Sequence, residues 1–290
     1  MRFEYMEPVT IENAIDLLVK HNGQAKVIAG GTDLIVQMRQ KEIKSEHLVD
    51  ITRIPGFDYI DYNETEGLRI GALTTIHTIE KSAEIHENYP AISQAAGKLA
   101  SVAIRNLGTL GGNLCNASPS ADMPPALIGL GAKVKIVGPE RERIVALEDF
   151  FTGPGSTVLK KWELLVEVQV PVSLPGTRGV YLKHAIRGSI DLAIVGIAVV
   201  IMMDPGDGVC QDIKIALGAV APTPIRARSA EEIIKGKRID EDLIEKSAET
   251  AQAEAHPISD VRASAEYRSE MVKVFTRRAL RQVAVETEMN

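Results

Sequence analysis

Two clusters of small residues interrupt the apolar pattern of this chain and constrain its fold more than any other feature. The first, Gly30-Gly31-Thr32-Asp33, follows a short apolar run, and the second is Gly108-Thr109-Leu110-Gly111-Gly112-Asn113. Glycine has no Cβ, so backbone N–H groups can turn toward an anion that lies against the chain. If a helix opens at Asp33, its N-terminal amides add to this effect. One cluster alone is most simply a tight turn, but two together favour a pyrophosphate held between two loops.

The familiar nucleotide fingerprints are absent from the sequence. Neither G-x-G-x-x-G nor G-x-x-x-x-G-K-[ST] occurs, and both motifs place glycines at fixed spacing around a phosphate. A Rossmann dinucleotide site and a P-loop are therefore disfavoured. The sequence also lacks a convincing nucleophile triad, a paired-carboxylate motif and a zinc signature, so we predict no catalytic residue in this chain.

Charge and hydropathy exclude two further classes of protein. The formal net charge is −6 and no segment is strongly basic, which argues against a nucleic-acid-binding surface. The longest apolar run, at 192–203, is much shorter than the ~20 residues that span a bilayer, and it is typical of a buried strand. The N-terminus has no long apolar region of the kind found in signal peptides. We therefore expect a cytoplasmic protein.

Cysteine and histidine usage gives no indication of a metal centre. The two cysteines, Cys115 and Cys210, are predicted to be free thiols, and two thiolates are too few for an iron–sulfur cluster. The histidines show neither i, i+4 pairing nor the spacing of metal ligands; they are His21, His47, His77, His86, His184 and His256. The sequence therefore predicts no metal site.

Hydrophobic periodicity indicates an α+β protein of two domains. It predicts helices over 10–20, 33–39, 75–82, 89–100, 240–255 and 265–285, and strands over 26–29, 48–51, 68–72, 133–137, 143–146, most of 158–171, 180–185, 194–203 and 213–219. Ser229-Ala-Glu-Glu has the form of a capping box, and 171–179 has the composition of a linker. We predict one domain over 1–175 and a smaller α+β domain, strands then helices, over 176–290.

Two segments carry a resemblance to a known family. VIAGGTDLIVQMR (27–39) and RNLGTLGGNLCNASPSADMPPAL (105–127) resemble the two FAD-binding loops of the medium (flavoprotein) subunit of molybdenum hydroxylases of the xanthine dehydrogenase and carbon monoxide dehydrogenase type. The resemblance continues through 149–171, 181–196 and 259–280. It implies a FAD-binding domain of the vanillyl-alcohol-oxidase (PCMH) type with two subdomains, followed by a smaller α+β domain with an antiparallel sheet and helices.

The resemblance also implies which residues hold a noncovalent FAD. They are Val27, Ile28, Ala29, Gly30, Gly31, Thr32, Asp33, Leu34, Thr109, Leu110, Gly111, Gly112, Asn113, Asp122, Leu165 and Lys183. Three of them have simpler explanations: Leu165 as core packing, Lys183 as a surface lysine, and Asp122 as the N-cap of the helix after it. Replacement of a glycine in either loop is expected to evict FAD by filling the space of the phosphate.

Three neighbouring residues carry weaker indications. Leu99 occupies a position where some family members place an aromatic ring against the cofactor, Arg105 is either a phosphate partner or a solvated helix residue, and Cys115 is expected only to pack.

The function implied by the resemblance is electron transfer within a larger oxidoreductase. Electrons would pass from a molybdopterin centre on a large subunit, through two [2Fe–2S] clusters on a small subunit, to the FAD of this chain and then to an acceptor such as NAD⁺ or a quinone. The expected assembly is a dimer of heterotrimers. Two alternatives stay open: a self-contained FAD-dependent reductase of the same fold, and a cofactor-binding assembly protein. The sequence indicates neither the substrate nor the acceptor.

Overall fold

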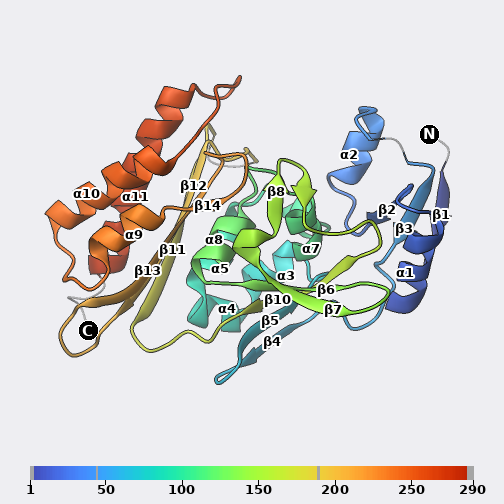
Figure 1. The fold of residues 1–290 in the computed structure, drawn as a ribbon, viewed down its shortest axis with the longest axis horizontal. Coiled ribbons are helices and arrows are strands. Elements are labelled where there is room, and N and C mark those ends of the chain that lie inside the picture. Colours follow the sequence, from blue (N-terminus) through green and yellow to red (C-terminus); the bar gives the residue numbers. More distant parts are fainter. Residues whose placement is uncertain (1–2, 44, 188–189, 286–290) are drawn as a thin grey trace.

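The computed structural model describes residues 3–43, 45–187 and 190–285, whose elements form three successive parts of the molecule (Figure 1). The N-terminal part is a three-stranded parallel sheet of order β1-β3-β2 with two helices. Its α1 is capped by Thr10, whose hydroxyl accepts a hydrogen bond from the Asn13 amide. The elements are β1 (Glu4–Met6), α1 (Ile11–Lys20), β2 (Ala25–Ile28), α2 (Leu34–Arg39) and β3 (His47–Asp50).

The middle part is a five-stranded antiparallel sheet of order β4-β5-β10-β6-β7 with helices packed on it. Its strands are β4 (Ile60–Asn63), β5 (Gly67–Gly71), β6 (Lys133–Val137), β7 (Glu142–Ala146) and β10 (Leu164–Val170), with the small pair β8 (Phe151–Gly153) and β9 (Ser156–Thr157) beside them. Its helices are α3 (Ile76–Lys81), α4 (Ala83–Asn88), α5 (Pro90–Lys98), α6 (Val102–Arg105), α7 (Leu110–Cys115), α8 (Met123–Gly129) and the 3₁₀ turn η1 (Leu147–Asp149).

The C-terminal part is a four-stranded antiparallel sheet, of order β11-β12-β13-β14, followed by three helices. Figure 1 shows α9, α10 and α11 together on one side of this sheet, whereas α5 and α8 of the middle part pack against it from the other side. The elements are β11 (Thr177–His184), β12 (Val195–Met203), β13 (Cys210–Gly218), β14 (Ile225–Arg226), α9 (Arg228–Ile234), α10 (Glu241–Glu254) and α11 (Ala265–Val285).

The long apolar run is the central strand β12, as the sequence predicts. Its alternate residues belong to two different cores: Ile197 and Val199 pack in the C-terminal core, whereas Ala198 packs in the core of the middle part. Small side chains on the second face let α8 approach the sheet closely. The α+β fold class is thereby confirmed, with an antiparallel sheet and helices at the C-terminal end.

Two predicted boundaries are wrong because extended backbone and strand differ only in hydrogen bonding. The predicted strand over 158–171 begins only at Leu164, and the predicted linker over 171–179 already contains the first residues of β11 from Thr177. The predicted boundary between the two domains, at residues 175 and 176, remains a prediction. The last five residues of the predicted second domain, 286–290, lie outside the described residues.

The predicted capping box at Ser229 is also wrong. Helix α9 begins at Arg228, and its N-cap residue makes no side-chain capping bond. The carboxylate of Glu254, at the end of α10, instead accepts hydrogen bonds from the amides of Ser229 and Ala230 at 3.1 and 3.2 Å. A distant side chain therefore satisfies the free amides at the start of this helix.

Within the described residues, no helix combines the length and the apolar character needed to cross a membrane.

Candidate functional site

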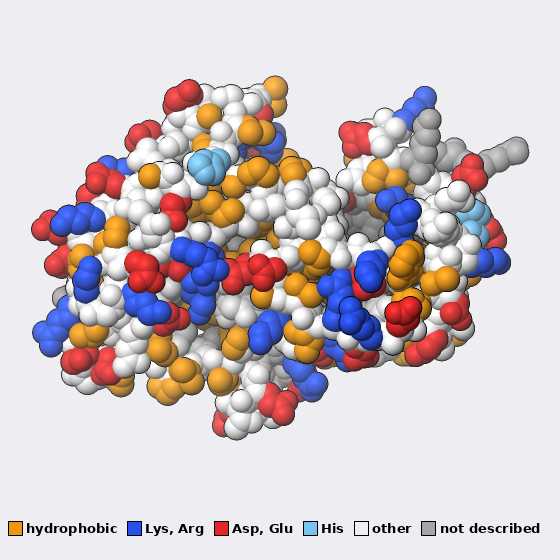
Figure 2. Space-filling view, in the orientation of Figure 1, with side chains coloured by type: hydrophobic (Ala, Val, Ile, Leu, Met, Phe, Trp, Pro, Cys, Tyr) orange, Lys and Arg blue, Asp and Glu red, His pale blue; other side chains and the backbone are white. Residues whose placement is uncertain are grey.

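A cavity of about 520 Å³ lies between the N-terminal and middle parts, with the two glycine loops in its wall. Its volume falls within the range of roughly 300–1,000 Å³ that is typical of small-molecule sites. The surface is indented at this boundary, between the lobe that carries α2 and the centre of the molecule (Figure 2). The predicted residues that line the cavity are Val27, Ile28, Ala29, Gly30, Gly31, Thr32, Asp33, Leu34, Thr109, Gly111, Gly112, Asn113, Asp122 and Leu165.

Two of the predicted residues lie outside this lining. Leu110 is fully buried in the core of the middle part, and its amide donates to the carbonyl of Thr74 at 3.0 Å. Lys183 lies on β11 and contacts Asp122, which itself lines the cavity. Leu165, 5% exposed, belongs to the core and to the cavity wall at once.

The first glycine loop joins β2 to α2 and offers backbone donors. Gly31 has φ +67°, a conformation that glycine adopts far more readily than other residues. The amides of Gly31 and Thr32 have no hydrogen-bond partner among the described residues. Because both residues line the cavity, these two N–H groups are available to an anionic ligand.

The second glycine loop differs from the expectation, because most of its amides are already used. Gly111 donates to the carbonyl of Ala72 at 2.8 Å, Gly112 donates to the hydroxyl of Thr109 at 3.1 Å, and Asn113 donates to the carbonyl of Thr109 at 3.0 Å. Of the amides of Thr109–Asn113, only that of Thr109 has no hydrogen-bond partner among the described residues, so this loop presents fewer free amides than expected. Helices α2 and α7 are also only six residues long, so their dipoles add little.

The second loop instead contributes a buried acceptor. The Oδ1 atom of Asn113 is buried and has no hydrogen-bond partner among the described residues, although this residue lines the cavity. Buried polar atoms are almost always paired, so an unpaired acceptor in a cavity wall indicates a ligand that donates a hydrogen bond there. A hydroxyl or a ring N–H meets that requirement.

The glycines are required for a different reason from the one expected. A Cβ on Gly30 would overlap the backbone carbonyl of Leu107, and a Cβ on Gly111 would lie 2.8 Å from the Cβ of Ala72. At these two positions the chain itself occupies the space that was expected for phosphate. The two loops thus need glycine so that their backbones can pack against neighbouring segments.

Asp122 and Lys183 form a buried pair at the edge of the cavity. Lys183 Nζ lies 2.8 Å from Asp122 Oδ2, and the Tyr181 hydroxyl donates to Asp122 Oδ1 at 2.7 Å. Each side chain of the ion pair is 6% exposed. Burial raises the pKa of Asp122, and the Lys183 ammonium and the Tyr181 hydroxyl act in the opposite direction. Lys183 is therefore not a surface lysine, and Asp122, although at the N-cap position of α8, makes no capping bond.

Of the three other carboxylates in the cavity wall, Glu163 and Asp191 are also paired with cations, whereas Asp33 has no ion-pair partner among the described residues. Glu163 lies 2.7 Å from an Arg143 nitrogen, and Asp191 lies 2.7 Å from an Arg187 nitrogen. The negative charges of Glu163 and Asp191 are therefore largely balanced, which reduces the repulsion that the cavity wall would exert on a phosphate.

Arg105 stabilises the cavity wall and is not positioned as a phosphate partner. Its Nε atom donates to Glu80 at 2.9 Å, and its Nη1 atom donates to the carbonyl of Leu99 at 2.9 Å. The residue is only 8% exposed. Leu99 and Ala100 both line the cavity, so this guanidinium fixes their backbone from behind.

Several residues that line the cavity were not predicted from the sequence. Gln37 Nε2 donates to Asn116 Oδ1 at 3.2 Å and so links α2 to the end of α7. Ile190 and Leu192 reach the cavity from the C-terminal part; they lie in the segment 181–196 that carries the resemblance, but they were not among the predicted contacts. Cys115 also lines the cavity, but burial raises the pKa of its thiol to about 12, which leaves the thiol protonated and unreactive. Both cysteines are free, as predicted.

Two family models together match nearly the whole chain. Residues 1–173 match the model of the FAD binding domain in molybdopterin dehydrogenase, and residues 180–283 match the CO dehydrogenase flavoprotein C-terminal domain. The chain belongs to the FAD-binding medium subunits of the molybdenum hydroxylases. It is thus the flavoprotein subunit of an oxidoreductase, and its cofactor is FAD. The two free amides and the unpaired acceptor in the cavity suit the phosphates and the hydroxyl or N–H groups of this molecule.

Individual relatives match along nearly the whole chain. The glyceraldehyde dehydrogenase medium chain of Sulfolobus acidocaldarius is 33% identical over 282 residues, which cover 97% of this chain and 98% of the relative. The carbon monoxide dehydrogenase medium chain of Afipia carboxidovorans is 36% identical over 279 residues, which cover 96% of this chain and 95% of the relative. The structure of reconstituted CO dehydrogenase from Oligotropha carboxidovorans gives a TM-score of 0.94 at 35% identity, with 98% of both chains covered. The resemblance inferred from the two glycine loops is confirmed.

Proposed function

We propose that this chain carries electrons from the [2Fe–2S] clusters of a partner subunit, through FAD, to an external acceptor such as NAD⁺ or a quinone. The observation that supports this most is the cavity, where two unpaired amides and a buried unpaired acceptor line one space between the two glycine loops. When bound, FAD supplies the redox chemistry, and the protein supplies binding, orientation and electrostatics.

Individual residues have distinct roles in this proposal. The amides of Gly31 and Thr32 hold the phosphates, and Asn113 Oδ1 accepts a hydrogen bond from a hydroxyl or N–H of FAD. Arg105 keeps the backbone of Leu99 and Ala100 in place as part of the wall. The remaining contacts predicted from the resemblance, including those of Asp122 and Leu165, belong to the same proposal.

The proposed partners are a large molybdopterin-binding subunit and a small subunit with two [2Fe–2S] clusters, in a cytoplasmic dimer of heterotrimers. The names of the relatives support this, since they are medium chains of dehydrogenases, and one similar structure is described as lacking the Mo-pyranopterin moiety of its molybdenum cofactor. With only two cysteines, this chain cannot supply the four thiolates of a cluster.

The proposal is tested on the complex that copurifies with the tagged chain. The complex is reduced with dithionite without oxygen and mixed with NAD⁺ or a soluble quinone, while the iron–sulfur absorption is followed. We expect reoxidation only while FAD is present, with loss after removal of the flavin and recovery after its addition. Equal reoxidation without FAD would contradict the proposal. NADPH oxidation by the chain alone would favour the self-contained reductase, and a folded chain that refuses FAD would favour the assembly protein.

A further inference from the structure

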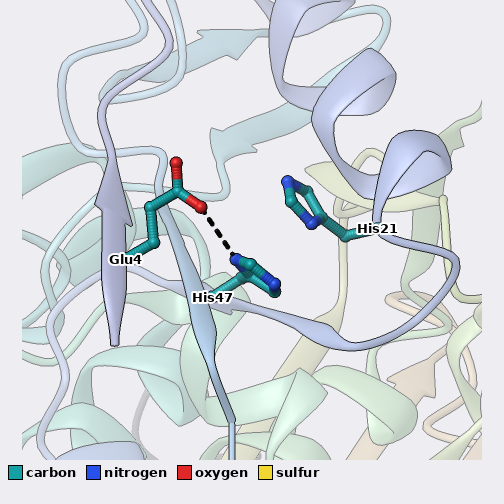
Figure 3. Close-up of side chains that lie close together, drawn as sticks. All are labelled: Glu4, His21 and His47. Atoms are coloured by element: carbon teal, nitrogen blue, oxygen red, sulfur yellow. Dashed lines mark hydrogen bonds and ion pairs between the residues drawn. The ribbon is translucent and has the colours of Figure 1, made fainter. Parts of the chain in front are cut away.

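Three side chains that can ligate a metal lie together at the edge of the N-terminal sheet (Figure 3). They are Glu4 on β1, His47 on β3 and His21 at the end of α1. One ligand atom from each lies within 4.8 Å of the other two. His47 Nδ1 is 3.1 Å from Glu4 Oε2, and the two imidazole rings have their centroids 3.9 Å apart.

Separate elements of the fold hold these three side chains in place. Strands β1 and β3 are parallel, with Glu4 directly opposite His47 in the register. His21 is the C-cap residue of α1, and its amide donates to the carbonyl of Leu17 at 3.0 Å. The ligands are therefore positioned by sheet pairing and by a helix end, which leaves little backbone to be ordered when an ion binds.

An ion pair between Glu4 and His47 does not account for His21. The Nε2 atom of His21 is buried and has no hydrogen-bond partner among the described residues. An unsatisfied buried nitrogen is costly, and the neutral imidazole nitrogen is a common metal ligand. The unpaired nitrogen beside a histidine and a carboxylate thus indicates a ligand with a positive charge.

We propose that Glu4, His21 and His47 bind a divalent transition-metal ion, of which Zn²⁺ is the best match. Two imidazoles and one carboxylate are a known three-residue ligand set for zinc, with water in the fourth position, and imidazole favours zinc, copper, nickel or iron over magnesium or calcium. The Glu4 side chain is 61% exposed, so the fourth position is open to water. Each imidazole would bind the ion through its unprotonated ring nitrogen and keep its proton on the other nitrogen.

This site is separate from the FAD cavity. His47 pairs with Ala25 at the start of β2, whereas Val27 and Ile28 at the end of that strand line the cavity. Because the ligands come from β1, β3 and the end of α1, a bound ion would tie these elements together. The proposal therefore assigns a stabilising metal and leaves electron transfer to FAD.

The test uses the full chain after treatment with a chelator and removal of that chelator. Titration calorimetry with ZnCl₂ is expected to give one strong equivalent. His21→Ala and His47→Ala should each weaken binding at least about tenfold, the scale on which loss of a supporting group already acts. His256→Ala removes an exposed histidine outside the cluster and should bind as the unmodified chain does. FAD content, measured after denaturation, shows whether each variant has folded.

A second measurement needs no substitution. Zn²⁺ should protect His21 and His47, but not His256, from modification by diethyl pyrocarbonate, as read by peptide mass spectrometry. Absence of a strong equivalent, or equal affinity in the folded His21→Ala and His47→Ala variants, would overturn the proposal. Equal modification with and without Zn²⁺ would do the same.

Discussion

At the scale of single residues, Gly30 and Gly112 belong to different loops and meet different neighbours. A Cβ on Gly30 would overlap the backbone carbonyl of Leu107, whereas a Cβ on Gly112 would lie 3.0 Å from the Thr109 hydroxyl. A backbone carbonyl is held by its own segment, but a side-chain hydroxyl can rotate. The two glycines should therefore respond differently to the same substitution.

Gly30→Ala is expected to lower the free energy of unfolding by about 2–3 kcal/mol, the usual cost of overpacking, and to lose FAD because the two loops move apart. Gly112→Ala should cost less stability and affect FAD content more than the fold. Gly153→Ala is the control, since nothing lies within 4 Å of its Cβ position. Urea denaturation and the ratio of FAD to protein measure both effects. Equal losses of stability in the two loop variants would contradict this reasoning.

Substitution of Asn113 should best separate an effect on FAD binding from an effect on folding. Its Oδ1 atom is buried without a partner. When FAD is not bound, an Asn113→Ala variant therefore loses no hydrogen bond to that oxygen. Asn113→Ala should thus leave the unfolding midpoint of the FAD-free protein nearly unchanged. The Kd for FAD should rise about tenfold, the value of one hydrogen bond near 1.4 kcal/mol. Fluorescence titration of FAD measures this; an unchanged Kd with a destabilised protein would assign Asn113 to the fold alone.

At the scale of elements, Arg268 of α11 connects this helix to the start of β12 in the C-terminal sheet. The side chain is 3% exposed; its Nη1 atom donates to the carbonyl of Ile194 at 2.7 Å, and its Nη2 atom donates to Asp260 at 2.8 Å. Partial burial raises the pKa of Asp260, but hydrogen bonds from the Arg262 amide and from the Arg268 and Arg262 side chains outweigh it and hold the pKa well below its usual range.

This network predicts a loss of stability in acid. A carboxyl whose pKa is lower in the folded than in the unfolded chain contributes stability above its unfolded pKa, near ~4, and loses it as the pH falls further. Asp260→Asn should be less stable than the unmodified protein at pH 7, and the difference should shrink as the pH falls below ~4. Thermal unfolding of both proteins between pH 7 and 3 measures it. A difference that stays constant across this range would exclude the ionised Asp260 as its source.

Elements with strong local signals could be predicted from the sequence, and features that depend on distant partners could not. The strand over 194–203 and the helices over 240–255 and 265–285 follow from periodicity alone, and the two glycine loops indicated a cofactor. The cap of α9 comes from Glu254, and the partner of Asp122 is Lys183, 61 residues further along the chain. The cluster of Glu4, His21 and His47 could not be predicted for the same reason, because strand register and the end of α1 bring its members together.

At the scale of the whole molecule, the C-terminal sheet is shared between two cores. One face of β12 packs under α11 through large residues such as Ile197, and the other face meets α8 through small residues such as Ala198, while α5 packs on the neighbouring strand β11. Substantial apolar area is buried on both faces, so the C-terminal and middle parts are expected to unfold together. The pair formed by Asp122 and Lys183 lies at this junction and beside the cavity.

That pair should couple the stability of the junction to FAD binding. Asp122→Ala leaves the Lys183 ammonium buried without its counter-ion, which costs about 3–5 kcal/mol, and FAD affinity should fall as the cavity wall shifts. Lys183→Met leaves Asp122 with only the Tyr181 hydroxyl and should also destabilise the protein. The double variant should lose much less than the sum of the two, because neither charge then remains buried alone. Urea denaturation of the four proteins measures the coupling energy, with His256→Ala as an unrelated control. Additive losses would show that the two residues act independently, and the junction would then have to be held by the apolar faces of the sheet alone.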